Sequence, residues 1–231
     1  LILGTVFFAF QIFCDFSGYS DIAIGASKIL GINLMKNFNR PYFSKSVSEF
    51  WRKWHISLST WFRDYLYIPL GGSRGTKLWQ YFNILITFVV SGFWHGANWT
   101  FIFWGFLNGL YMIISDLTKD IRNNITGLIN LSRFKKLYKS IQITITFTLI
   151  CFSWIFFRAR SLSHALELIK KIILDLINHI TNLFNIEFYQ TITVPDIYIH
   201  DFIISFGAIL VLIIVQLLQR KYSITTLLNR F

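Results

Sequence analysis

The chain has 231 residues, of which 54% are hydrophobic and 14% are charged, against about 25% charged residues in soluble domains. This composition excludes an ordinary soluble domain, because a chain of this length cannot bury so many apolar side chains, and it predicts a surface that faces lipid. The net charge of +11 at pH 7 requires no nucleic-acid partner, since basic loops facing anionic lipid account for it.

The first element is an uncharged apolar run over residues 1–13, which is typical of the end of a membrane-spanning helix. No basic segment precedes it, as a signal peptide would require. We therefore expect the C-terminal part of a longer membrane protein, in which residues 1–231 form a single membrane domain.

The second element is an amphipathic helix, expected over residues 46–67. Ser46 and Glu49 have the spacing of a capping box at its start. Aromatic and apolar residues then follow at three- and four-residue steps and predict one stripe: Phe50, Trp54, Leu58, Trp61 and Tyr65. Arg52 and Arg63, eleven positions apart, would lie on nearly the same side of this helix.

A glycine-rich loop with the sequence GGSRG follows at residues 71–75. It lacks the GxxxxGK[ST] spacing of a phosphate-binding P-loop. Its basic tip is Arg74, and arginine presents paired donors that suit phosphate. We expect Arg52, Arg63 and Arg74 to bind the phosphate groups of a cofactor, with contact to lipid headgroups as the alternative.

Residues 82–94 and 99–115 carry no charge, and only four residues separate them. A helix from Tyr81 to His95 would rise only about 21 Å at 1.5 Å per residue. We therefore expect a hairpin whose turn lies within the membrane. Irregular backbone at that depth must be buried in protein or line a cavity, which predicts a cavity at His95.

Two further spans are expected at residues 141–157 and 202–218, which have the length needed to cross the hydrocarbon core. Residues 162–184 have the apolar periodicity of an amphipathic helix that lies in the membrane interface. The fold class is thus an all-α polytopic membrane protein with interfacial amphipathic helices.

The distribution of charge predicts the orientation. Residues 36–77 contain eight Lys or Arg against two acidic residues, and residues 119–139 contain six against one. The positive-inside rule places both segments and the C-terminus in the cytoplasm, with residues 178–201 on the other side. We expect a multi-pass protein of the inner (plasma) membrane, although Arg158 and Arg160 fall on the outer side.

Two of the five histidines are candidates for chemistry. His95 lies at the intramembrane turn and His55 on the tryptophan-rich helix, and ionisable residues at membrane depth are usually functional. An imidazole that binds a backbone carbonyl remains the structural alternative for each. We expect no metal site, because HExxH and CxxC are absent, and GxSxG is absent too. What remains is histidine as a general base that takes a proton from an attacking hydroxyl.

Three blocks between Phe13 and Gly105 are similar to a known family: FCDFSGYSDIAIG, NFNRPYFSKSVSEFWRKWHISLSTWFRDYLYIPLGG and GFWHGANWTFIFWG. They resemble the signature blocks of the membrane-bound O-acyltransferase (MBOAT) family, most closely its alginate O-acetylation branch. The resemblance implies that His95, in WHG, is the catalytic base and that His55, in WxxWH, is the second histidine. It also implies a multi-helix fold whose mid-membrane waist joins a cytoplasmic donor tunnel to an outward-facing funnel.

The function expected from this resemblance is O-acyl transfer by an acyltransferase. The acyl group, expected to be acetyl, would come from a cytoplasmic acyl-CoA or acyl-carrier thioester, with no tightly bound cofactor. The acceptor would be an exported polysaccharide such as alginate, or a periplasmic or extracellular acyltransferase partner. The alternatives are D-alanyl transfer to teichoic acid and a non-catalytic polymer-export scaffold.

Overall fold

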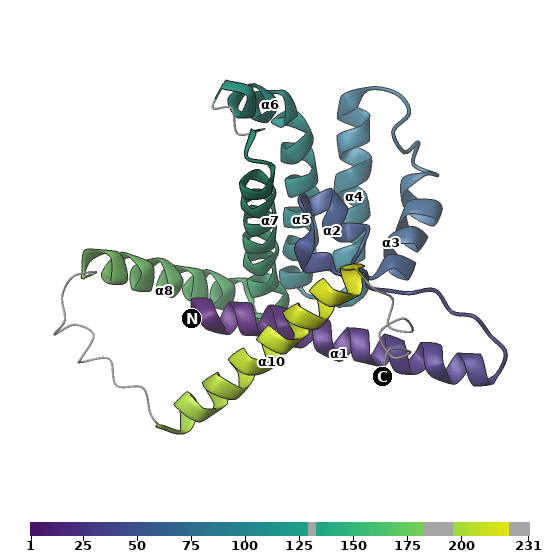
Figure 1. The fold of residues 1–231 in the computed structure, drawn as a ribbon. Coiled ribbons are helices and arrows are strands. Elements are labelled where there is room, and N and C mark those ends of the chain that lie inside the picture. The colour runs from purple at the N-terminus through teal and green to yellow at the C-terminus, as the bar shows by residue number, and fades with distance from the viewer. Residues whose placement is uncertain (129–132, 183–195, 222–231) are drawn as a thin grey trace. The chain divides into compact units, whose positions relative to one another are not determined.

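The computed structural model describes residues 1–128, 133–182 and 196–221 (Figure 1). Within these ranges the elements are helices with no β-strand, which confirms the all-α prediction. The helices are α1 (Ile2–Ile29), η1 (Pro41–Phe43), α2 (Val47–Trp51), α3 (Ile56–Phe62), η2 (Arg63–Tyr67), α4 (Lys77–His95), α5 (Trp99–Leu117), α6 (Lys119–Leu128), α7 (Lys135–Arg158), α8 (Leu162–Thr181) and α10 (Asp196–Lys221).

The chain divides into two compact units, Leu1–Lys171 and Ile172–Phe231. The first contains α1 to α7 and the first half of α8, and the second contains the end of α8 and all of α10. The prediction of a single membrane domain stays a prediction.

Helices α4 and α5 form a hairpin that a three-residue turn closes, as predicted for residues 82–115. Glycines let the two backbones approach closely. A Cβ atom added at Gly92 would lie 2.2 Å from the carbonyl oxygen of Phe101, and one at Gly105 would lie 2.2 Å from that of Phe88. Such small residues are typical of contacts between membrane helices. The depth of the turn in a membrane stays a prediction.

Polar contacts hold both ends of the hairpin. At the open end, the Oδ2 atom of Asp116 accepts hydrogen bonds from Lys77 Nζ at 3.1 Å and from the Tyr81 hydroxyl at 2.9 Å. At the closed end, the Oδ1 atom of Asn98 accepts from the Thr100 amide at 3.0 Å and caps α5. These contacts fix the register of the two helices and therefore the position of the turn.

An aromatic core joins the hairpin to α7 and to the segment between η1 and α3. The rings of Trp104 and Trp154 stack at 5.8 Å, and those of Trp54 and Trp154 lie 5.3 Å apart. All three tryptophans are at most 4% exposed. In Figure 1, α7 stands beside α5, while α1 runs across the ends of α4, α5 and α7. The face of α1 toward these ends becomes one wall of the site described below.

The prediction of one continuous helix over residues 46–67 is wrong. Helix α2 ends at Trp51, α3 begins only at Ile56, and residues 63–67 form a π-helix. The break coincides with hydrogen bonds from Asn37, which lies in the irregular segment between α1 and η1. The carbonyl oxygen of Asn37 accepts from the Ile56 amide at 3.0 Å, and its Oδ1 atom accepts from the Ser57 amide at 3.1 Å. These bonds satisfy the amides that begin α3, so the helix can start anew there.

This break has two consequences for the predictions. Arg52 and Arg63 belong to different elements, so the prediction that they share a face of one helix is wrong. The aromatic stripe also divides, because Trp54 is 4% exposed in the core whereas Trp61 is 52% exposed.

The predicted start of α2 is correct in its main contact. The Oγ atom of Ser46 accepts a hydrogen bond from the Glu49 amide at 3.1 Å, as a capping box requires. The reciprocal bond differs, because the Glu49 carboxylate accepts from the amide of Lys45 rather than from that of Ser46, at 2.8 Å.

Among the described residues, four helical stretches are long and apolar enough to cross a membrane: Ile2–Ile29, Trp99–Leu117, Lys135–Arg158 and Ile199–Leu218. The predicted spans at residues 141–157 and 202–218 lie inside α7 and α10. The N-terminal span is longer than predicted, because α1 continues to Ile29 rather than ending near Phe13. Helix α8 confirms the amphipathic helix as far as Thr181, and its predicted end at residue 184 lies outside the described residues.

Candidate active site

His95 is the last residue of α4, at the closed end of the hairpin. The turn begins with Gly96, where an added Cβ would lie 2.7 Å from the Phe101 ring, so a larger residue would displace either that ring or the turn. The half-buried imidazole packs edge-on against Trp104 at 5.2 Å and Phe157 at 5.3 Å. Packing against these aromatic rings therefore fixes the orientation of the imidazole.

His55 precedes α3 in the left-handed conformation, with φ 45° and ψ 56°. This conformation is uncommon outside glycine, and such strained residues gather at functional sites. The bonds from Asn37 to the next two residues hold the turn in place. The imidazole lies edge-on to the Phe16 ring of α1 at 4.6 Å. The helix break thus directs this side chain toward α1 and the end of α4.

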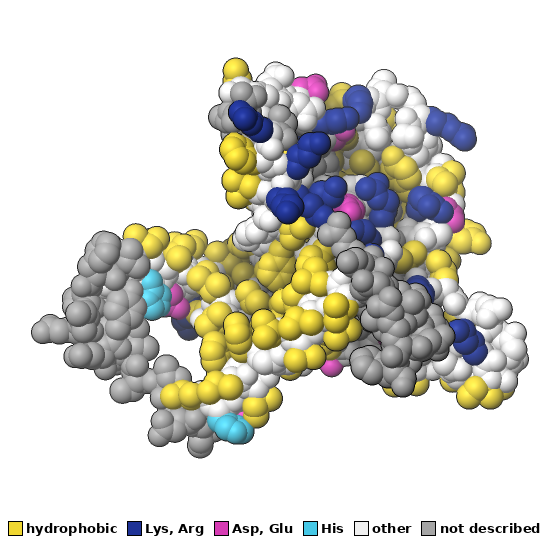
Figure 2. Space-filling model, in the orientation of Figure 1, with side chains coloured by type: hydrophobic (Ala, Val, Ile, Leu, Met, Phe, Trp, Pro, Cys, Tyr) yellow, Lys and Arg dark blue, Asp and Glu magenta, His cyan; other side chains and the backbone are white. Residues whose placement is uncertain are grey.

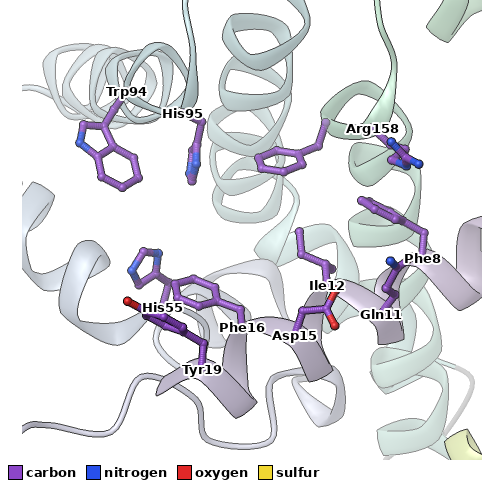
Figure 3. A pocket seen from close by; sticks show the side chains of 11 residues that line it. Phe8, Gln11, Ile12, Asp15, Phe16, Tyr19, His55, Trp94, His95 and Arg158 are labelled. Carbon is purple, nitrogen blue, oxygen red and sulfur yellow. The ribbon is translucent and has the colours of Figure 1, made fainter. Parts of the chain in front are cut away.

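The two histidines line one cavity of about 780 Å³. Figure 3 shows their imidazoles pointing into the same space from opposite sides, with Trp94 beside His95. The remaining walls come from α1 and from Phe157 and Arg158 at the end of α7. The cavity expected at His95 is therefore present, and the fold brings His55 to it from a distant segment.

The surroundings of His55 favour its neutral form. Burial is the main cause that lowers the pKa of His55 from 6.5 to about 4, and the positive charge that His95 can carry adds to the effect. A neutral imidazole at pH 7 can accept a proton or donate its one N–H.

The structural alternative for these histidines was a hydrogen bond to a backbone carbonyl. In the described part of the chain, neither His55 nor His95 makes such a bond; their contacts are with aromatic rings. His164 differs from both, because its Nδ1 atom does have a backbone partner: it accepts a hydrogen bond from the Arg160 amide at 3.3 Å. The roles of His55 and His95 stay predictions, but both imidazoles point to the cavity.

Sequence reasoning missed the polar residues of α1 that share this cavity. Gln11, Asp15 and Tyr19 follow one another at four-residue steps and line it with the histidines. The signal was in the sequence: these are polar residues spaced to share one face of an apolar helix. Arg158 also lines the cavity, where its guanidinium lies 5.6 Å from the centre of the Phe8 ring.

The three arginines predicted to bind a cofactor lie elsewhere. Arg52, Arg63 and Arg74 are all exposed, and none of them lines the cavity. Arg63 is paired with its neighbour Asp64, with Nε and Oδ1 at 2.7 Å. Arg74 follows two glycines with positive φ, Gly71 and Gly72, in a loop before α4. Phosphate binding by these arginines stays a prediction.

Metal-ligating residues do not cluster in the described part of the chain. No group of three or more His, Cys, Asp or Glu side chains is placed there to hold a metal ion.

Comparison with known proteins agrees with this arrangement. Residues 1–161 match MBOAT, the membrane-bound O-acyltransferase family. The chain is 44% identical over 163 residues to a probable alginate O-acetylase AlgI of Azotobacter vinelandii, covering 71% of this chain and 30% of that protein. It is 41% identical over 172 residues to a peptidoglycan O-acetyltransferase of Helicobacter pylori, covering 73% and 30%.

A more distant relative is a teichoic acid D-alanyltransferase of Streptococcus thermophilus, 34% identical over 171 residues, covering 67% of this chain and 40% of that protein. The chain thus spans about 30% of the length of the O-acetylating relatives named above. The family match includes both histidines, every residue that lines the cavity, and the helices that position them. The chain therefore belongs to the membrane-bound O-acyltransferase family.

Proposed function

We propose that this chain carries the acyl-transfer centre of an enzyme that moves an acetyl group from a cytoplasmic thioester to an exported polysaccharide such as alginate. One observation carries the proposal: His55 and His95, which are distant in the sequence, point into one aromatic cavity. The O-acetylating names of two relatives support the acetyl group. An acceptor hydroxyl on a periplasmic or extracellular partner protein would use the same chemistry.

The proposed mechanism assigns His95 as the general base. It takes the proton of the acceptor hydroxyl while the hydroxyl oxygen attacks the thioester carbon. The C–O bond forms, the C–S bond breaks, and the imidazolium returns the proton to the leaving thiolate. The products are an ester and a free thiol, and His95 is neutral again. His55 donates its N–H to the thioester oxygen as negative charge develops there.

The proposed donor is acyl-CoA or an acyl-carrier thioester, which binds without any tightly held cofactor. Its phosphate groups would contact Arg52 and Arg74, which are exposed; the Arg63 side chain is also exposed but already has Asp64 as a partner. We place the protein in the inner membrane with several spans and a cytoplasmic C-terminus. The bias of Lys and Arg toward residues 36–77 and 119–139 supports this orientation.

The donor proposal gives a test with an internal control. Arg52→Glu and Arg74→Glu should raise the KM for the thioester and leave kcat unchanged, because they weaken ground-state binding only. Arg63→Glu should have a smaller effect, since Asp64 already neutralises that guanidinium. The measurement is steady-state kinetics on membranes with matched protein levels. An unaltered KM in well-inserted Arg52 and Arg74 variants would end the proposal that these side chains bind the donor. Poorer insertion with an unaltered KM would instead indicate contact with lipid headgroups.

The second candidate is D-alanyl transfer to teichoic acid, which the 34% identity to a D-alanyltransferase favours. A non-catalytic export scaffold is the third reading, but a scaffold has no need for two imidazoles that share a cavity.

One experiment separates these functions. Membranes that contain the full-length protein are given either labelled acetyl-CoA or a labelled D-alanyl-carrier thioester, and the exported polymer is then isolated. We expect acetyl label on the polymer. D-alanyl label would establish the second candidate, and normal polymer export without label from either donor would establish the scaffold.

A further inference from the structure

One face of α1 forms a wall of the cavity. Its lining residues follow the three- and four-residue steps of a helix: Phe8, Gln11, Ile12, Asp15, Phe16 and Tyr19. The polar members stand at every fourth position, and apolar or aromatic residues flank them. The wall therefore presents a row of hydrogen-bonding groups between hydrophobic surfaces, opposite His95 (Figure 3).

Asp15 is the acidic residue of this row, and its carboxylate is the group most costly to place within a membrane. It lies near the middle of Ile2–Ile29, a helix apolar enough to span a membrane, where a carboxylate is costly unless it has a partner. Within the described part of the chain, its side chain makes no hydrogen bond and no ion pair, and the same holds for the Gln11 amide. Both groups instead face the cavity that contains the two histidines. Both side chains are exposed, so a ligand that enters this cavity can reach them and supply the partner.

We infer that Asp15 and Gln11 form the subsite that binds the hydroxyl groups of a sugar acceptor, across the cavity from His95. This inference rests on the proposed acyl transfer, and it adds the residues that hold the acceptor. One hydroxyl faces the imidazole and is acylated, while its neighbours on the same sugar donate to the Asp15 carboxylate and exchange hydrogen bonds with the Gln11 amide.

The chemistry of the row distinguishes the acceptor from the donor. A hydroxyl donates readily to a carboxylate, whereas the phosphate groups of a thioester donor would be repelled by Asp15. The flanking rings of Phe16 and Tyr19 offer apolar surface to the C–H faces of a sugar, and the tyrosine also has a polar end. The cavity volume of about 780 Å³ falls within the usual range for ligand sites.

The length of the row favours a sugar over a protein hydroxyl. Gln11 and Asp15 are one helical turn apart, so their Cβ atoms are about 5–6 Å from each other. A sugar ring carries several hydroxyls over a comparable distance and can satisfy both groups at once. A serine or tyrosine of a partner protein brings only one hydroxyl, which His95 itself would engage.

The test compares two variants that make the same chemical change on the same helix. Asp15→Asn should raise the KM for an acceptor oligosaccharide about tenfold or more, because a hydrogen bond to a charged group is lost. The KM for the thioester should stay the same. Asp21→Asn is the matched control, since Asp21 is also on α1 but does not line the cavity, and it should change neither constant. The probes are alginate and peptidoglycan oligosaccharides, the polymers in the relatives' names.

Binding without turnover provides the second measurement. In a His95→Ala background, calorimetry should show that adding Asp15→Asn or Gln11→Ala weakens oligosaccharide binding, whereas adding Asp21→Asn does not. An unchanged acceptor affinity in the Asp15 and Gln11 variants would overturn the inference, and so would a raised KM for the thioester instead. Reduced protein abundance with normal affinity would overturn it too, by showing a structural role.

The two proposals fail in different ways. If His95→Ala abolishes acetyl transfer but Asp15→Asn leaves acceptor binding intact, the acyl-transfer centre stands and the acceptor subsite falls. If the wild-type protein acylates only a peptide hydroxyl, the polysaccharide acceptor and the sugar subsite both fall, while acyl transfer itself stands.

Discussion

His95 is held by rings rather than by hydrogen bonds. Trp104 and Phe157 support its imidazole edge-on, and Trp94 stands beside it at 4.9 Å. A base that is fixed by shape keeps both ring nitrogens available for substrate. This arrangement suits proton transfer, since a strong bond to a protein carbonyl would occupy one nitrogen and fix the tautomer.

The first prediction concerns this base. His95→Ala should lower the rate of acyl transfer by about 10²–10⁴-fold, the usual contribution of a positioned acid–base group, while the protein still accumulates in membranes. His164→Ala is the control. His164 lies on α8 and does not line the cavity, so its replacement should not change the rate of acyl transfer. Transfer at the wild-type rate in His95→Ala would remove His95 from the mechanism.

His55 provides a prediction about pH. Its pKa is lowered to about 4, so the imidazole stays neutral through pH 5, and its own contribution to acyl transfer should not change between pH 7 and pH 5. Folding should respond too. Between pH 6.5 and 4 the unfolded chain takes up a proton at His55 that the folded chain does not, so the folded state loses stability as the pH falls.

Thermal unfolding at pH 7 and pH 5 measures this second effect. Between pH 7 and pH 5, the melting temperature of His55→Gln should fall less than that of the wild type, because glutamine does not titrate. It should also turn over more slowly at pH 7. Equal losses of melting temperature in the two proteins would show that His55 is not buried as its pKa requires.

At the scale of elements, the break between α2 and α3 decides where His55 points. Residues that read as one helix become two, because Asn37 binds the amides of Ile56 and Ser57. In a continuous helix, the side chain of His55 would share a face with the residues three and four positions away on either side. The turn instead places it against Phe16 of α1 and within 6.5 Å of Trp94, measured between ring centres.

The hairpin gives a prediction at this same scale. Gly105→Ala should destabilise the protein by about 1–3 kcal/mol, the cost of overpacking, because the new Cβ meets the carbonyl oxygen of Phe88 at 2.2 Å. Gly25→Ala on α1 is the control: nothing lies within 4 Å, so the helix should become more stable by up to about 1 kcal/mol. Thermal unfolding in detergent checks both. A tolerated Gly105→Ala would mean that α4 and α5 do not need close contact.

For the whole molecule, the testable property is its orientation in the membrane. In a Cys14→Ser background, a cysteine introduced at Ser73 should react only with reagents that enter the cytoplasm. A cysteine introduced at Thr191, which lies outside the described residues, should react from the other side. Cys14 is replaced because it is exposed, whereas Cys151 is buried. The opposite labelling pattern would invert the topology and place the thioester donor on the wrong side.

Much of the helical architecture could be predicted because it depends on local properties. Apolar runs of sufficient length predicted α5, α7 and α10, and apolar periodicity predicted α8. The uncharged pair of segments around residues 95–98 predicted the hairpin. Helix length was harder to predict: α1 continues past Phe13 through charged residues to Ile29, because nothing in its backbone ends the helix earlier.

The sequence by itself determined which residues were candidates for chemistry, since an imidazole in an apolar stretch is visible without a structure. It could not show that His55 and His95 share a cavity, because this depends on Asn37 breaking a helix from a distance. It also left Asp15 and Gln11 unnoticed until α1 was seen to cross the ends of α4, α5 and α7. The spacing of residues along one helix is a local property. Which other segments a helical face packs against depends on tertiary contacts between parts of the chain that are far apart in the sequence.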